Sequence, residues 1–173
     1  MGNLEKYLDV SPKLKEYYVQ KISKLSEEQK SELEDLVIRL EKAGAKNPLS
    51  WAFSEVTESI PQFGRFLVLK KLFEIAKSPK DNLIMALDFD SEIKGKFLEF
   101  SNMIGEEKFL EFLTSFSKGI VWNVMELVDE GNRNMDEDKV NWVLLKTDEN
   151  GKHSEQIIQG LHEDFLEFEN EIK

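Results

Sequence analysis

The sequence predicts a mainly α-helical single domain, a multi-helix bundle with one C-terminal β-hairpin, and an α+β fold is the alternative. Three observations support this fold class. The stretch 106–132 is the longest run with helical periodicity and is rich in large apolar residues. Capping signals divide most of the preceding chain into helices. Residues 140–158 combine β-forming residues with a turn sequence, which favours a hairpin.

The predicted central helix covers residues 106–132. Its apolar residues recur every three or four positions, which predicts a buried face made of Phe109, Leu113, Phe116, Ile120, Val124 and Leu127. This face is widened by Phe112, Val121, Met125 and Val128. Glu106 and Glu107 suit the positive end of the helix dipole, and Gly131 suits a left-handed stop. We therefore expect other helices to surround this one.

The first part of the chain, residues 1–46, is predicted to form a helical hairpin. Ser11 followed by Pro12 is typical of a helix start. Ser26 and Gln29 have the spacing of a capping box, which begins a second helix.

The segment 48–132 is expected to hold the buried helical core, because it begins with few charges and then carries apolar residues on nearly all sides of 63–76. Residues 82–90 fit a strand as well as a helix, and a helix is favoured.

The C-terminal part is expected to contain a β-hairpin and a last helix. Residues 140–147 form the first predicted strand, 148–151 have turn chemistry, and 152–158 return as the second strand. Residues 160–173 are predicted to form an acidic terminal helix. The chain shows no internal repeat and no low-complexity linker, so we expect one domain over 1–173.

The composition limits which cellular compartment and which kinds of chemistry are expected for this chain. The chain contains no cysteine, which excludes disulfides, thiolate zinc sites and cysteine nucleophiles. The first residues lack the apolar core of a secretory signal, and no run approaches the roughly 18–20 apolar residues of a membrane span. We therefore expect a soluble, cytoplasmic protein without membrane attachment.

The negative charge is concentrated near the C-terminus. The net charge is −11, and residues 129–173 carry 13 acidic and 5 basic side chains, or −8. Such a chain repels phosphate backbones, so no nucleic-acid partner is expected. The segment 64–80 has a net charge of +4, which we interpret as a solvated helix surface.

Motifs for catalysis and metal binding are absent from the sequence. The acidic stretch from Asn132 departs from a calcium loop, since Glu137 stands where that loop needs glycine. Neither histidine follows a glutamate at the spacing of a di-iron site. The carboxylates Glu55 and Glu58 lie one turn apart near Trp51, which is a common arrangement on helix surfaces. We predict no catalytic residue, no metal ligand and no cofactor.

The strongest functional signal is an aromatic residue in acidic surroundings. Trp142 lies between two acidic stretches, and this composition is typical of a protein-binding surface that captures a basic partner. The predicted partner-binding residues are Asp136, Glu137, Asp138, Trp142, Glu163, Asp164 and Glu167. The other interpretation is that Trp142 packs the hairpin onto the helices.

The sequence thus favours a non-enzymatic acidic binding protein of the inhibitor, immunity or regulatory type, with its oligomeric state left open. The alternative is a small-molecule-binding protein or a carboxylate-dependent enzyme with a pocket inside the helical core. The order of a Trp-bearing strand, a turn, a returning strand and the closing helix LHEDFLEFENEI resembles the end of bacterial SUKH-type immunity proteins. The resemblance covers roughly the last 35 residues of the chain.

Overall fold

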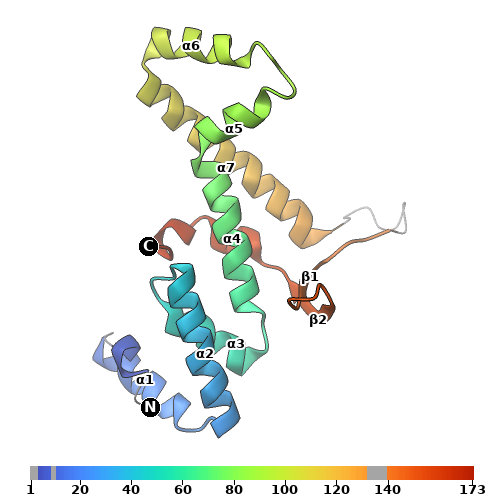
Figure 1. Ribbon diagram of the computed structural model, residues 1–173. Coiled ribbons are helices and arrows are strands. Elements are labelled where there is room, and N and C mark those ends of the chain that lie inside the picture. Colours follow the sequence, from blue (N-terminus) through green and yellow to red (C-terminus); the bar gives the residue numbers. More distant parts are fainter. Residues whose placement is uncertain (1–3, 9–10, 132–139) are drawn as a thin grey trace. The chain divides into compact units, whose positions relative to one another are not determined.

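The computed structural model describes residues 4–8, 11–131 and 140–173 (Figure 1). It is mainly helical with one two-stranded antiparallel sheet near the C-terminus, which confirms the predicted fold class. The elements in chain order are η1 (Glu5–Leu8), α1 (Pro12–Ile22), α2 (Glu27–Ala43), α3 (Pro48–Glu58), α4 (Gln62–Lys77), α5 (Pro79–Ala86), α6 (Ile93–Ile104), α7 (Glu106–Glu130), β1 (Leu144–Thr147), β2 (His153–Ile158), α9 (Leu161–Phe165) and η2 (Phe168–Asn170).

Local sequence signals set most helix boundaries. The capping box of α2 is complete, because Ser26 Oγ accepts the Gln29 amide at 3.1 Å and Gln29 Oε1 accepts the Ser26 amide at 3.0 Å. Gly44 ends this helix in the left-handed conformation, with φ of 98°. The ambiguous segment 82–90 begins as helix α5, as favoured from the sequence.

Residue contacts group the chain into two compact units. The first unit contains residues 1–67, 144–159 and 167–173, and the second contains 68–143 and 160–166. Helix α4 begins in the first unit and ends in the second. The single cooperative domain expected from the sequence therefore stays a prediction, and each unit has a core of its own.

The first unit is built on α2 and α3. Their facing sides are buried and consist of Leu33, Leu36, Val37, Leu40, Leu49, Ala52, Phe53 and Val56. A second cluster joins three segments, since Trp51 of α3, Phe66 of α4 and Phe168 of η2 have ring centroids 5.3–6.5 Å apart. Edge and tilted ring contacts of this kind add to the stabilisation from apolar burial.

The β-hairpin also belongs to the first unit. β1 and β2 pair antiparallel, with Leu144 opposite Ile158 and Thr147 opposite His153. The first strand is shorter than the predicted 140–147 and begins at Leu144. A Cβ added at Gly64 would lie 3.2 Å from Ile158 Cδ1, so glycine at this position allows close packing of the hairpin on α4.

The predicted terminal helix over 160–173 is only partly helical. α9 ends at Phe165, and the last residues form a β-bridge between Ala45 and Ile172. The Lys46 amide donates to the Glu171 carbonyl at 2.8 Å, and the Lys173 amide donates to the Gly44 carbonyl at 2.9 Å. The main-chain groups of the last residues thus form hydrogen bonds with the loop after α2. In a longer helix, the same groups would have formed hydrogen bonds within the helix.

In the second unit, the buried side of α7 differs from the predicted one. The prediction that Phe112, Phe116, Ile120, Val124 and Leu127 are core residues is wrong, because they are 46–59% exposed. Val121 and Met125 are the buried residues of this helix. They share the unit's core with Leu69, Phe73, Ala76, Leu161 and Phe165. The helix carries apolar residues on two adjacent faces, and periodicity alone does not decide which one packs.

Candidate protein-binding surface

Trp142 is held at the C-terminal end of α7. Its indole Nε1–H donates to the Leu127 carbonyl at 3.0 Å, and its main-chain amide donates to Asn141 Oδ1 at 2.8 Å. The last carbonyls of a helix lack partners within the helix, so this indole satisfies one of them. Trp142 is nevertheless 42% exposed. The ring is therefore fixed in orientation while much of its surface faces solvent.

Gly131 makes this arrangement possible. Its backbone has φ of 63° and ψ of −147°, a conformation that is essentially restricted to glycine. A Cβ at this position would also collide with the Asn141 side chain and come within 3.0 Å of the Trp142 carbonyl. The glycine expected only to end the helix thus also makes room for the segment that carries Trp142.

Helix α9 is attached to the same end of α7 through a buried carboxylate. Asp129 Oδ2 accepts the His162 main-chain amide at 2.9 Å and lies 2.7 Å from the His162 ring Nδ1. The Asp129 side chain is 2% exposed. The His162 ring also meets Trp122 edge-on, with centroids 6.2 Å apart. These contacts position the first turn of α9, where Glu163 and Asp164 lie.

The predicted partner-binding residues fall into three groups. Trp142, Glu163 and Asp164 belong to the second unit, and their segments both contact the last turns of α7. Glu167 belongs to the first unit. The acidic stretch Asp136–Glu137–Asp138 lies outside the described residues. The structure thus brings a Trp and two acidic side chains to one helix end.

Sequence reasoning missed the apolar residues near Trp142. Leu127 is 56% exposed, and Val140 and Val143 flanking the Trp are 62% and 55% exposed. The high density of apolar residues around Trp142, in the stretch VNWVLL, could have indicated this exposed apolar surface. The same stretch also fits a strand, which is how it was interpreted.

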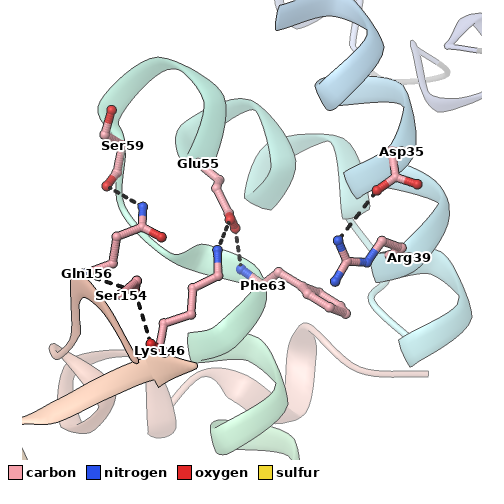
Figure 2. A network of polar contacts seen from close by, with 8 residues as sticks. All are labelled: Asp35, Arg39, Glu55, Ser59, Phe63, Lys146, Ser154 and Gln156. Atoms are coloured by element: carbon pink, nitrogen blue, oxygen red, sulfur yellow. Dashed lines mark hydrogen bonds and ion pairs between the residues drawn. The ribbon is translucent and has the colours of Figure 1, made fainter. Parts of the chain in front are cut away.

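Glu55 has a structural role (Figure 2). This buried carboxylate accepts the Phe63 main-chain amide at 2.7 Å and the Lys146 ammonium at 3.0 Å, so it ties α3 to the start of α4 and to β1. Glu58, at the last position of α3, is exposed. Glu55 and Glu58 therefore do not form a pair of carboxylates that could act together on a substrate.

A hollow of about 450 Å³ lies in the first unit. Its polar lining includes Lys6, Tyr7, Tyr18, Lys46, Asn47 and Glu171. Next to it, Glu41 Oε2 accepts from the Tyr7 hydroxyl at 2.7 Å and from Lys6 Nζ at 2.9 Å. The Tyr7 hydrogen bond, followed by that from Lys6, lowers the pKa of Glu41. This hollow is built mainly from the N-terminal segments and the start of α3, whereas the sequence placed a possible pocket inside the helical core.

The described residues bring together no group of three or more His, Asp or Glu side chains that could hold a metal ion. In the same part of the chain, none of the helices combines the length and the apolar character that crossing a membrane requires.

Comparisons with known proteins found no relationship: no family model matches the chain, no curated protein matches it, and no solved structure matches it.

Proposed function

We propose that this chain is a non-enzymatic binding protein that captures a basic protein partner at the end of α7 where Trp142 and α9 lie. One observation carries the proposal: the Trp142 indole is oriented by its hydrogen bond to the Leu127 carbonyl and is still 42% exposed. Large aromatic side chains held in this way are common anchors of protein interfaces, because less conformational entropy is lost when a fixed ring is buried.

Two other features support such an interface. Exposed Leu127, Val140 and Val143 extend the apolar contact area. Glu163 is exposed on α9, and the residues from 129 onward carry a net charge of −8. Acidic side chains at the rim accelerate association with a basic protein, whereas the apolar centre slows dissociation.

The test begins with capture of partners from an extract of the native host, followed by association kinetics with each purified partner. Trp142→Ala should raise the dissociation rate by about tenfold or more, as expected for an aromatic anchor. Glu163→Lys combined with Asp164→Lys should slow association in low salt. The difference should shrink at physiological ionic strength, where charges are screened beyond about 8 Å.

A matched control changes the net charge by the same amount at a different place. Glu149→Lys combined with Glu155→Lys makes the same change of net charge on exposed positions of the hairpin region. This control should bind like the parent. If the control and the α9 variant slow association equally, net charge alone explains the effect and the proposed surface is wrong. A dissociation rate that Trp142→Ala leaves unchanged would also contradict the proposed surface.

A second candidate function is small-molecule binding in the hollow of the first unit. Its volume of about 450 Å³ is in the range of ligand pockets, and Tyr7, Lys46 and Glu171 converge on it. A thermal-shift screen with small carboxylates and amines tests this candidate. Stabilisation that Lys46→Met abolishes and Trp142→Ala leaves intact would favour it over the protein-binding role.

A further inference from the structure

The three helices α5, α6 and α7 expose an unusual amount of apolar surface. Among the described residues, α5 and α6 contain no buried side chain, although both are rich in large apolar residues. Phe89, which follows α5, is 91% exposed, and Met103 in α6 is 70% exposed. Exposed apolar surface of this extent is typical of a contact site.

The centre of this surface is a continuous row of rings. Phe100 of α6 contacts Phe109 of α7 at a centroid distance of 5.6 Å, Phe109 contacts Phe112 at 6.4 Å, and Phe112 contacts Phe116 at 6.2 Å. Phe112 and Phe116 are each 59% exposed. The rings therefore order one another while their outer sides remain uncovered.

Along α7, the row continues as an apolar ridge made of Phe112, Phe116, Ile120 and Val124, spaced four residues apart. Ser115, Gly119 and Asn123 have the same spacing and form a small-residue groove directly beside the ridge. A Cβ added at Gly119 would meet nothing within 4 Å, so this groove is open. One helix face thus presents a ridge and a matching groove side by side.

We propose that this face is covered by a second copy of the same chain, with the two α7 helices antiparallel about a twofold axis near Gly119. In that arrangement, the apolar ridge of each copy enters the small-residue groove of the other, as a twofold-symmetric interface requires. The ridge and groove residues differ from the residues named for the partner-binding surface around Trp142, so each proposal has its own test.

The available area is sufficient for a stable dimer. Seven large apolar side chains on this face are 46–70% exposed. They are the four residues of the apolar ridge together with Phe100, Met103 and Ile104, which share one face of α6. With about 200 Å² for a whole large side chain and about half of that area exposed on each of these seven, two copies would bury on the order of 1,400 Å². Stable specific interfaces bury about 1,200–2,000 Å² in total.

The charges at the two ends of α7 favour the antiparallel arrangement. Lys108 and Glu130 are both exposed and lie equally far before and after Gly119. An antiparallel pair centred on Gly119 therefore places Lys108 of one copy opposite Glu130 of the other. A parallel pair would place Glu106, Glu107 and Glu111 opposite their own copies, which is unfavourable.

Sedimentation equilibrium of the full chain tests the dimer. We expect a species of twice the 20.1 kDa chain mass that dissociates on dilution. Gly119→Leu should weaken the dimer by about 100-fold or more, because it fills the groove at the centre of the interface. Leucine is the better helix former, so the variant should keep its helical circular dichroism and unfold at a higher temperature as a monomer.

Gly95→Leu is the matched control. Gly95 also lies in a helix, and a Cβ there also meets nothing within 4 Å, but it lies away from the Phe100 side of α6. This variant should dimerise like the parent. A parent chain that remains monomeric at high concentration, or a dimer that Gly119→Leu does not weaken, overturns the proposal.

Engineered cysteines test the orientation, since the chain has none of its own. A mixture of Ser115→Cys and Asn123→Cys chains should form disulfide-linked dimers on mild oxidation, whereas Ser115→Cys alone should not. Efficient cross-linking of Ser115→Cys alone would overturn the antiparallel arrangement. Binding of the parent monomer to anionic lipid vesicles, abolished by Phe116→Glu, would assign the face to a membrane surface instead and would also overturn the proposal.

Discussion

Asp129 Oδ2 accepts the main-chain amide of His162 at 2.9 Å and lies 2.7 Å from the ring Nδ1 of the same residue, and the Asp129 side chain is almost completely buried. Asp129 Oδ1 has no hydrogen-bond partner among the residues that the structure describes. A single buried oxygen thus contacts both the main chain and the ring of His162, so this carboxylate helps to attach the start of α9 to the end of α7.

Asp129→Ala should therefore destabilise the second unit. The His162 amide would lose its acceptor while remaining partly buried, which costs about 1–3 kcal/mol. Urea unfolding measures the loss, and hydrogen exchange should show faster exchange at residues 161–165. Glu163→Gln, an exposed change on the same helix, should alter stability by less than about 0.5 kcal/mol. Equal stability of Asp129→Ala and the parent would show that α9 docks without this carboxylate.

The Glu55–Lys146 pair should be worth more than a surface ion pair. Glu55 is 7% exposed and also accepts the Phe63 amide, so Lys146→Met should cost about 1–3 kcal/mol. A double-mutant cycle with Glu55→Gln isolates the pairwise energy. The matched cycle at Asp35 and Arg39, an exposed pair 3.5 Å apart (Figure 2), should give at most about 0.5 kcal/mol. Equal coupling in both cycles would contradict the structural role of Glu55.

Phe168 should be required for the stability of the first unit. It is completely buried, and its ring contacts Phe66 and Trp51. Phe168→Ala leaves a cavity in this aromatic cluster and should cost about 3–5 kcal/mol in thermal or denaturant unfolding. Leu166→Ala, two residues earlier and 76% exposed, should be close to neutral. Similar stability of the two variants would mean that the C-terminal segment adds little to the core.

Acid should remove the contribution of Glu41. The hydrogen bonds from Tyr7 and then Lys6 favour the ionised carboxylate, so the pKa of Glu41 in the folded chain lies below the ordinary 4.5. The stabilisation is present above the unfolded-state pKa and is lost as the pH falls through the folded-state pKa. An NMR titration should place the Glu41 midpoint below 4.5. Tyr7→Phe should raise this midpoint more than Lys6→Met does, and a parent midpoint of 4.5 would contradict both contacts.

Most helix boundaries before residue 131 could be predicted from the sequence, because those signals are local. The Ser26–Gln29 capping box, the proline at the start of α3 and the left-handed Gly44 each act within one turn of the chain, so spacing in the sequence is sufficient to predict them. The hairpin turn before Gly151 is local in the same sense.

Which apolar faces are buried depends on long-range packing. α7 carries apolar residues around much of its circumference, and the choice of Val121 and Met125 over Phe116 and Ile120 follows from what packs against them. The hydrogen bond from the Trp142 indole to the Leu127 carbonyl likewise joins residues that are 15 positions apart in the sequence. Such contacts depend on which segments meet in space, and hydrophobic periodicity contains no information about that choice.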